Sequence, residues 1–345
     1  MHTIEYYWGS LMGYRVALVG ATGLVGAQFL KILEERRFPL DSLKLLASDR
    51  SAGRKLSFKG ELLEVSETKE DSFENIDIAL FSAGSDISKY FSPIAAKSGA
   101  IVIDNSSAFR MDPDVPLVVP EVNPQDIQTH KGIIANPNCS TIQMVVALNP
   151  IHSVNPIKRV IVSTYQAVSG TGADAVLELK KQVEQIVEGN EGEVVSTTYP
   201  HQIAFNTLPF VESFTDGQYT TEEWKMVYET RKILHEPDML VCATCVRVPV
   251  YTGHGESVNI ELSQPMSAEK ARNILSEAPG LVVQDDPSLD LYPLPINTIG
   301  TDDVFVGRIR EDISHPNGLV MWIVADNLRK GAALNAVQIA EIIAK

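Results

Sequence analysis

Cysteine is scarce in this sequence, with three residues in a chain of 345. An odd and small number of cysteines does not form a disulfide framework. Residues 1–13 also lack the basic and apolar segments of a secretory signal peptide. We therefore expect a protein of the reducing cytoplasm. Because Met12 lies just before the first strand-like run, we interpret residues 1–11 as an extension from an upstream start.

Positive charge is also in short supply. The chain has 29 Lys and Arg against 44 Asp and Glu, which gives a net charge of −15 at pH 7. This balance provides no basic surface for nucleic acid, and a few local cations must hold any anionic substrate. Long apolar runs are missing as well, since none approaches the roughly 18 residues of a membrane-spanning helix. We expect neither nucleic acid nor membrane as a partner.

What the sequence does contain is the opening of a dinucleotide-binding unit. Residues 15–20 form a β-branched run, Gly20-Ala-Thr-Gly-Leu-Val-Gly26 follows, and an amphipathic stretch ends near Arg37. Strand, glycine turn and helix in this order are typical of the first βαβ unit of a Rossmann domain. The spacing G-x-x-G-x-x-G differs from the common G-x-G-x-x-G, so a glycine turn without a ligand stays open as an alternative.

The end of the next strand bears on the choice of cofactor. The run 43–48 is followed by Asp49-Arg-Ser-Ala-Gly53. An arginine here accommodates the 2′-phosphate of NADP, whereas an acidic residue hydrogen-bonds the free ribose of NAD. Ser48, Arg50 and Ser51 favour NADP. Asp49 keeps NAD open, and a solvated arginine without a ligand is the remaining alternative.

The rest of the pattern indicates two domains, in keeping with the chain length. Strands at 77–82 and 100–104, with a helix at 87–98 between them, predict an α/β Rossmann-type doubly wound domain. Later strand-like runs predict an α+β domain with a mostly antiparallel sheet: 158–168, 240–251, 256–262, 304–310 and 318–325. We predict a helix at 327–343 that packs back on the first domain. The expected domains are 14–138 with 327–345, and 139–326.

Cys139 is the most informative single residue. It lies in Asn136-Pro-Asn-Cys-Ser-Thr141, where an apolar strand gives way to a helical pattern. A thiol at a helix N-terminus lies near the positive end of the helix dipole, so we expect a lowered pKa. Free N–H groups of the first turn would stabilise an oxyanion. The position predicts a nucleophile that attacks a carbonyl carbon, with a buried inert cysteine as the alternative.

Two residues are predicted to assist this nucleophile. His254 has glycine on both sides, so we expect an accessible loop imidazole whose ordinary pKa suits proton transfer. Gln166 ends a strand before a second glycine turn, Ser169-Gly-Thr-Gly172, and its amide would orient a substrate carbonyl. A purely structural glutamine is the alternative.

Three cations have settings that suit an anionic substrate. Arg110 follows a strand of the first sheet, Lys225 lies on a predicted helix, and Arg247 lies within a strand. A charge among apolar residues is unfavourable unless it is paired. Arg247 is therefore the best candidate for bidentate binding of a carboxylate. For Lys225, a solvated charge is the stronger alternative.

Cys242 and Cys245 have C-x-x-C spacing. Residues three apart in a strand point to opposite faces, and the chain has no second cysteine pair to complete a zinc site. We interpret both as buried sheet cysteines and predict no metal site.

Taken together, these motifs resemble the aspartate-β-semialdehyde dehydrogenase family, from about Tyr14 to Lys345. The segments that carry the resemblance are Gly20-Ala-Thr-Gly-Leu-Val-Gly26, Ser48-Asp-Arg-Ser-Ala-Gly53, Asn105-Ser-Ser-Ala-Phe-Arg110, Asn136-Pro-Asn-Cys-Ser-Thr141, Gln166-Ala-Val-Ser-Gly170, Glu222-Glu-Trp-Lys225, Arg247-Val-Pro-Val and Gly253-His-Gly-Glu256. The cysteine motif combined with the Gly-His-Gly-Glu loop is the most specific part, and residues 1–13 lie outside it.

The resemblance implies NADPH-dependent reductive dephosphorylation of L-aspartyl-4-phosphate to the semialdehyde, a branch step toward lysine, methionine and threonine. It implies at least a homodimer, with a homotetramer also open. Cys139 would form a thioester, His254 would move the proton, and Gln166 would position the carbonyl. Substrate contacts are implied for Arg247 and Glu222, and phosphate contacts for Arg110, Lys225 and Asn138. NADP contacts are implied for Gly20, Thr22, Gly23, Leu24, Val25, Arg50, Ser51, Ser169, Gly170 and Asn327. Glu222 is preferred to Glu223 because of its spacing from Lys225.

Three other functions stay open. The nearest is N-acetyl-γ-glutamyl-phosphate reductase, which Asn138 and the Gly-His-Gly-Glu loop disfavour. A glyceraldehyde-3-phosphate-type dehydrogenase is disfavoured by the arginine and serine at the strand end. A non-catalytic NADP-sensing module is disfavoured by the presence of Cys139, Gln166, Arg247 and His254.

Overall fold

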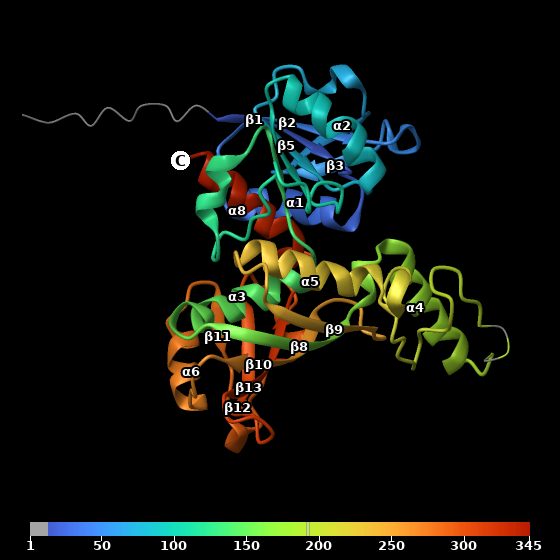
Figure 1. The fold of residues 1–345 in the computed structure, drawn as a ribbon. Coiled ribbons are helices and arrows are strands. Elements are labelled where there is room, and N and C mark those ends of the chain that lie inside the picture. Colours follow the sequence, from blue (N-terminus) through green and yellow to red (C-terminus); the bar gives the residue numbers. More distant parts are fainter. Residues whose placement is uncertain (1–12, 191, 193) are drawn as a thin grey trace, which may run out of the picture.

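The computed structural model describes residues 13–345 except 191 and 193. It consists of two halves, each built around its own sheet (Figure 1). The C-terminal segment of the sequence returns to the first half and packs there.

The first half contains a seven-stranded sheet in the order β3-β4-β2-β1-β5-β6-β7. Its strand pairs are parallel except for the antiparallel pair β3–β4. Short β-branched and leucine-rich runs form the central strands, because buried parallel strands need apolar side chains on both faces. The strands are β1 (Tyr14–Val19), β2 (Leu40–Ala47), β3 (Lys55–Phe58), β4 (Glu61–Glu67), β5 (Ile78–Phe81), β6 (Ile101–Asp104) and β7 (Ile133–Ala135).

Helices cover both faces of this sheet. On one face Val16 and Leu18 pack with α1 (Leu24–Glu35) and α8 (Leu334–Ile343). On the other face Ala17 and Val19 pack with α2 (Ser85–Lys97). Sequence analysis predicts a helix from residue 327, but the helical segment begins two residues later with a π-turn, Arg329–Ala333, that leads into α8. This packing agrees with the predicted doubly wound α/β domain.

The second half contains a six-stranded sheet in the order β11-β12-β13-β10-β8-β9. The three central pairs of this sheet are antiparallel, while β8–β9 and β11–β12 are parallel, so the sheet is mixed. The predicted fold class is confirmed. The strands are β8 (Ile157–Gln166), β9 (Leu240–Arg247), β10 (His254–Leu262), β11 (Leu281–Val283), β12 (Val304–Glu311) and β13 (Gly318–Ala325).

Helices α3 (Cys139–Val154), α5 (Thr221–Ile233) and α6 (Ala268–Ser276) pack on one face of the second sheet. Figure 1 shows α3 and α5 on the side of this sheet that faces the first half. On the opposite face, Ile161 and Tyr165 are exposed. The remaining helices are α4 (Ala173–Val187), α7 (Pro295–Thr298) and the 3-10 turns Asp49–Ser51, Glu70–Phe73, Pro124–Thr129, Val168–Gly170, Asp216–Gln218 and Pro287–Leu289.

The cysteines of β9 differ from the prediction that both are buried. Cys245 is buried against the core, but Cys242 is exposed on the open face. The reason is the strand alternation that separates residues three apart. Within the described part of the chain, no helix is long and apolar enough to span a membrane.

Candidate active site

Cys139 is the first residue of α3, and Asn138 caps that helix. The Asn138 side-chain oxygen accepts hydrogen bonds from the N–H groups of Ser140 at 3.0 Å and Thr141 at 3.3 Å. An asparagine in extended conformation at this position is a favourable cap, which explains why the helix begins directly after Asn138. Thus the local sequence places the thiol at the helix N-terminus, as predicted.

The prediction of a lowered pKa for Cys139 is wrong. Burial, and then the carboxylate of Glu222, raise the pKa of the thiol to about 12, although Arg247, Arg110 and Lys225 act in the opposite direction. Removing a thiolate from water disfavours its charge, and here that effect outweighs the three cations. The thiol is therefore protonated at neutral pH in this structure.

Glu222 connects the polar side chains around Cys139. It lies on α5 and accepts two hydrogen bonds from the Asn138 side-chain amide, at 2.9 and 3.0 Å. The Gln166 amide donates to Glu222 at 2.7 Å and to Ser140 Oγ at 2.6 Å. Burial opposes ionisation of Glu222, but Lys225 at 3.3 Å and these amides hold its pKa below the usual value.

The neighbouring Glu223 has a different role. Its carboxylate accepts from the backbone N–H groups of Thr220 at 2.7 Å and Cys245 at 3.0 Å, so it caps α5 and fastens it to β9. The geometry therefore places Glu222, and not Glu223, beside Cys139. This agrees with the choice made from the spacing to Lys225.

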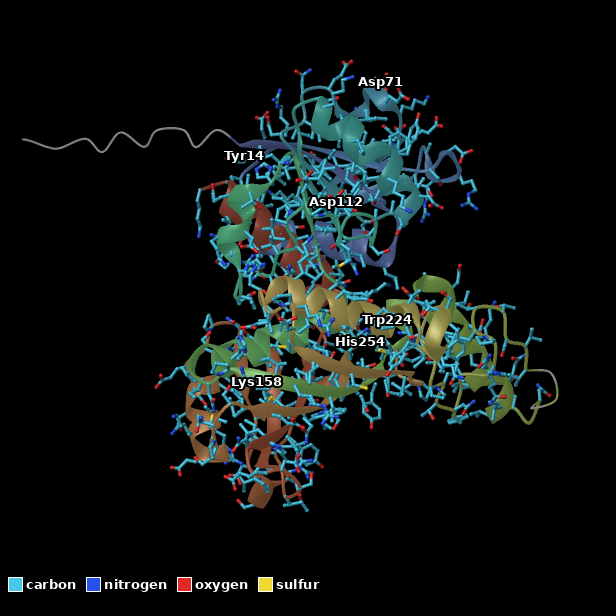
Figure 2. The ribbon with its side chains drawn as sticks, viewed as in Figure 1. Tyr14, Asp71, Asp112, Lys158, Trp224 and His254 are labelled. Atoms are coloured by element: carbon cyan, nitrogen blue, oxygen red, sulfur yellow. The ribbon has the colours of Figure 1, made fainter. Side chains whose placement is uncertain are left out.

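His254 differs from the prediction of an accessible loop residue. It is the first residue of β10 and is fully buried, in the half of the molecule built on the second sheet (Figure 2). Its Nδ1 atom accepts from the N–H of Ala167 at 3.0 Å, while Nε2 has no partner among the described residues. Burial, and then Arg247, lower its pKa to about 3. The imidazole is neutral, and its proton is on Nε2.

Arg247 is the last residue of β9 and is buried beside His254. Its Nη1 donates to the carbonyl of Ala167 at 2.7 Å, and its Nε has no partner among the described residues. Gly170 allows both side chains to approach: a Cβ there would lie 3.1 Å from Arg247 Nη1 and 3.2 Å from His254 Nε2. A cavity of roughly 310 Å³ adjoins these groups and is lined by Asn138, Cys139, Gln166, Gly170, Glu222, Arg247 and His254, among others.

The other two cations border a neighbouring cavity of roughly 460 Å³. Arg110 is ion-paired with Glu229 at 3.0 Å, and its other donors bind the carbonyls of Asn136 and Asn105. Lys225 forms ion pairs with Glu212 and Glu222 and is mostly buried, so the solvated alternative is wrong. Both residues line this cavity together with Val25, Asn138, Cys139, Ser169, Gly170 and Asn327.

The glycine-rich loop has the close approach that its sequence predicts. Gly20 has φ +84°, and a Cβ there would lie 2.3 Å from the carbonyl oxygen of Ser82. At the start of α1, Gly23 provides no side-chain cap, which leaves N–H groups of the first turn for an anion. Thr22 Oγ1 lies 3.4 Å from Ser51 Oγ, so this loop meets the turn after β2.

Of the remaining predicted cofactor residues, Leu24 and Val25 begin α1, and Arg50 is exposed beside Ser51. Asn327 donates to Ser169 Oγ at 2.9 Å and accepts from Gly253 N–H at 2.9 Å. Ser169 and Asn327 line the same cavity as Cys139, whereas Arg50 lies outside it.

Sequence analysis missed three residues at this site. Glu229 accepts from Asn138 N–H at 2.7 Å and pairs with Arg110. Its spacing of seven from Glu222 places both on one face of α5, which was a usable signal. Glu212 holds Lys225, and Gly331 lies so close that a Cβ there would be 2.9 Å from Cys139 Cβ. Neither contact has a local sequence signal.

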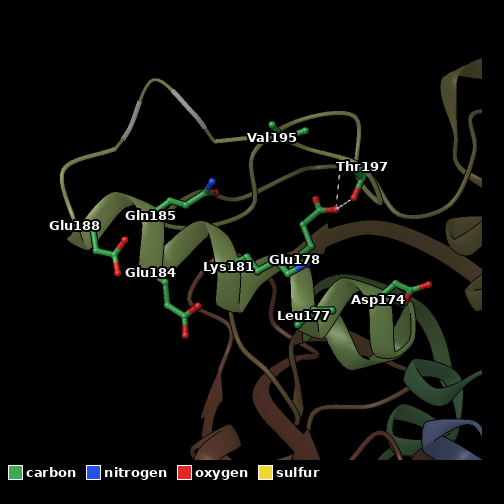
Figure 3. Close-up of a pocket in the computed structure, with 9 residues that line it drawn as sticks. All are labelled: Asp174, Leu177, Glu178, Lys181, Glu184, Gln185, Glu188, Val195 and Thr197. Carbon is green, nitrogen blue, oxygen red and sulfur yellow. Dashed lines mark hydrogen bonds between the residues drawn. The ribbon is translucent and has the colours of Figure 1, made fainter.

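A separate cavity of roughly 510 Å³ lies along α4 (Figure 3). Among the residues that line it, Glu178 is turned toward Thr197 and accepts from its N–H at 3.0 Å and its hydroxyl at 2.7 Å. None of the predicted site residues lines this cavity. Across the residues that the structure describes, no group of three or more His, Cys, Asp or Glu is placed to hold a metal ion.

Comparison with known proteins shows the family of the chain. The model of the "Semialdehyde dehydrogenase, NAD binding domain" matches residues 15–130, and that of the "Semialdehyde dehydrogenase, dimerisation domain" matches residues 148–330. The aspartate-semialdehyde dehydrogenase of Aquifex aeolicus is 60% identical over 337 residues, which cover 97% of this chain and 99% of that protein. The chain belongs to the aspartate-semialdehyde dehydrogenase family.

Solved structures of this family are similar as well. Aspartate semialdehyde dehydrogenase II from Vibrio cholerae, complexed with ASA, has a TM-score of 0.93 and 47% identity, covering 96% of this chain and 98% of that chain. The Candida albicans enzyme with NADP has a TM-score of 0.74 and 27% identity, covering 96% and 98%. The predicted family resemblance is confirmed, and with it the prediction that the chain is an enzyme, an oxidoreductase that binds a nicotinamide dinucleotide.

Proposed function

We propose that this enzyme catalyses the NADPH-dependent reductive dephosphorylation of L-aspartyl-4-phosphate to L-aspartate-4-semialdehyde, through a thioester on Cys139. The observation that carries the proposal is the position of Cys139, which lines both the cavity with Glu222 and Arg247 and the cavity next to the glycine-rich loop. The names of the relatives support it. In this assignment the enzyme acts in the biosynthesis of lysine through diaminopimelate, and of methionine, threonine and isoleucine. A cytoplasmic location stays a prediction.

The first cavity has the charges that an amino acid needs. The Nε donor of Arg247 has no acceptor among the described residues. A buried guanidinium donor without an acceptor is unfavourable, so a substrate carboxylate is the ligand that suits it. Glu222 is ionised and would bind the substrate ammonium group. We propose that Gln166, whose Oε1 also lacks a partner among the described residues, orients the acyl group.

Substrate binding would also activate the nucleophile. Glu222 is the charged group that raises the pKa of Cys139. When an ammonium group pairs with Glu222, that influence is neutralised, while Arg247, Arg110 and Lys225 continue to favour the thiolate. The thiol proton passes to the departing phosphate, the sulfur bonds to the acyl carbon, and the C–O bond to phosphate breaks with its electron pair on phosphate. Arg110, Lys225 and Asn138 would hold that phosphate.

The residues present fit a dinucleotide. The close approach at Gly20 and the uncapped start of α1 form a cradle for a pyrophosphate. When bound, NADPH supplies the hydride that reduces the thioester. The residues that would hold it are Gly20, Thr22, Gly23, Leu24, Val25, Arg50, Ser51, Ser169, Gly170 and Asn327. The preference for NADP over NAD rests on Arg50 and Ser51.

His254 would serve as a donor to the oxyanion of both tetrahedral states. Its Nδ1 is occupied by the N–H of Ala167, so Nε2–H faces the cavity. The Cys139 thiolate attacks the acyl carbon in the first step and is released when the aldehyde forms in the last. In both steps the acyl oxygen carries negative charge, which an N–H donor stabilises. This tautomer favours hydrogen-bond donation at Nε2 over removal of the thiol proton.

We infer that a second copy of the chain covers the open face of the second sheet. This face exposes Ile161 and Tyr165, and the Tyr165 ring lies 5.4 Å from that of Trp322. Aromatic side chains are enriched at such interfaces, and the matched family model for 148–330 is that of a dimerisation domain. A homodimer or homotetramer is therefore proposed, and its mass in solution tests it.

The decisive assay is phosphate-dependent NADP reduction with the semialdehyde, followed by the reverse reaction with aspartyl phosphate. We expect turnover in both directions and a mass increase on Cys139 from the acyl group. Faster turnover of N-acetyl-γ-glutamyl phosphate would instead make the enzyme a reductase of that substrate. NADPH binding without turnover of either acyl phosphate would support a sensing module and contradict the proposal.

A further inference from the structure

Glu256 is a buried acid for which the proposed mechanism has no use. It is the third residue of β10, a central strand of the second sheet, and is fully buried. The next residues on the same face, Val258 and Ile260, belong to the hydrophobic core. Neither carboxyl oxygen of Glu256 has a hydrogen-bond partner among the described residues. An ionised carboxylate in such a place would be strongly unfavourable.

Within the described residues, the charged groups that act on the pKa of Glu256 include no cation that would offset its burial. Opposite Glu256 in the sheet are Thr164 on β8 and Ile323 on β13, and the charged group that acts on it is another carboxylate, Glu222. Burial raises the pKa of Glu256 well above its usual value, and Glu222 adds to this, while the Gln143 amide acts in the opposite direction. The surroundings therefore favour a neutral acid.

Gln143 has a buried hydrogen-bond acceptor that lacks a donor among the described residues. It is fully buried on α3, one helical turn after Cys139. Its amide nitrogen donates to the backbone carbonyl of His254 at 3.4 Å, but its Oε1 lacks a donor within the described chain. The Gln143 amide is near enough to Glu256 to lower its pKa, but the effect of burial is larger. A protonated carboxyl group has one O–H donor, which is what Gln143 Oε1 lacks.

We infer that Glu256 is a protonated carboxylic acid in the native enzyme, that its O–H donates to Gln143 Oε1, and that this pair positions Cys139 against His254. Gln143 and Cys139 share one face of α3, since they are four residues apart. Glu256 and His254 share one face of β10, since they are two apart. The pair therefore ties the helix that carries the thiol to the strand that carries the imidazole.

Glu256 and Gln143 are positioning residues in this scheme, since neither lines the cavity that contains Cys139. The inference rests on the proposed function only for its effect on rate. Its first test needs no substrate: the infrared difference spectrum of the native enzyme minus Glu256→Gln at neutral pH. We expect the C=O stretch of a protonated carboxylic acid, shifted in D₂O. Carboxylate bands alone would overturn the inference.

Glu261 provides a matched control for that spectrum. It lies on the same strand and forms an ion pair with Arg159 at 2.7 Å. Native enzyme minus Glu261→Gln should therefore show carboxylate bands and no carboxylic acid band. The infrared measurement does not depend on turnover. If the enzyme were inactive toward aspartyl phosphate, the proposed function would be refuted, but the spectrum would still show whether Glu256 is protonated.

A kinetic test distinguishes a role of Glu256 in positioning the reacting groups from a role in the stability of the fold alone. Glu256→Gln retains a donor and an acceptor, so its kcat should stay close to that of the native enzyme. Glu256→Ala should lower kcat by about 10- to 100-fold, as expected when reacting groups move by about 1 Å, with KM nearly unchanged. An equal loss in Glu256→Gln, or full activity in Glu256→Ala, would overturn the positioning role. If Glu256→Ala does not fold, Gln143→Met replaces it with the same expectation.

Discussion

The Nδ1 atom of His254 accepts a hydrogen bond from the backbone N–H of Ala167 at 3.0 Å. Ala167 also accepts from Arg247 through its carbonyl at 2.7 Å. One peptide segment thus fixes the tautomer of the imidazole and the position of the guanidinium. Because both bonds use the backbone, they do not depend on the side chain at position 167.

This arrangement predicts a pH dependence of stability. The pKa of His254 is lowered to about 3 in the folded state, while an unfolded histidine titrates near 6.5. Between these values the unfolded chain binds the additional proton, so the free energy of unfolding falls as the pH decreases. We expect a contribution of about 1.4 kcal/mol per pH unit below pH 6. Urea unfolding of the native enzyme and His254→Gln measures it.

The exposed His201 provides the control for this prediction. The free energy of unfolding of His201→Gln should depend on pH as that of the native enzyme does. For His254→Gln the slope below pH 6 should be smaller by the contribution of one proton. Parallel curves for the native enzyme and His254→Gln would show that the imidazole is not held neutral.

The second prediction concerns the nucleophile itself. Cys139→Ala should abolish phosphate-dependent NADP reduction, because no other thiol lines the two cavities among the described residues. NADPH affinity should stay nearly intact, since the glycine-rich loop is not altered. Fluorescence titration with NADPH and the steady-state assay check both parts. Substantial residual turnover would contradict covalent catalysis.

The sequence was sufficient for what local patterns determine. The cap at Asn138 and the helix that starts at Cys139 follow from a short segment, and so does the glycine turn before α1. The state of the thiol does not, because its pKa depends on burial and on Glu222, which the fold brings from α5. His254 was misjudged for the same reason: flanking glycines suggested a loop, but the sheet pairs His254 with Ala325.

The third prediction tests how Glu222 acts on the thiol. In Glu222→Gln the negative charge that raises the pKa of Cys139 is removed, so the pKa should fall. Alkylation of the free enzyme by iodoacetamide at neutral pH should become faster, while kcat/KM for the semialdehyde should decrease because the ammonium group loses its partner. Glu223→Gln is the matched control, since this neighbour binds backbone N–H groups instead. An unchanged alkylation rate in Glu222→Gln would contradict the prediction.

The fourth prediction concerns Arg247. An ammonium group cannot reproduce the planar fork of a guanidinium, and Nη1 is already used by the carbonyl of Ala167. Arg247→Lys should therefore raise KM for the semialdehyde by about tenfold or more, which corresponds to about 1.4 kcal/mol, with a smaller effect on kcat. Arg54→Lys, at an exposed arginine, should leave both constants unchanged. An unaltered KM in Arg247→Lys would remove this residue from the substrate site.

The last prediction uses the contact between Gly331 and Cys139. A Cβ at position 331 would lie 2.9 Å from Cys139 Cβ and 3.3 Å from its Cα, so Gly331→Ala must displace the nucleophile or the π-turn. In a helical segment alanine is more favourable than glycine by about 1 kcal/mol. This gain offsets part of the loss in the free energy of unfolding that the strained contact causes. We therefore expect stability close to native but a kcat about 10- to 100-fold lower. If Gly331→Ala had both native kcat and native stability, the π-turn would accommodate the added Cβ without displacing the Cys139 sulfur, and the prediction would be wrong.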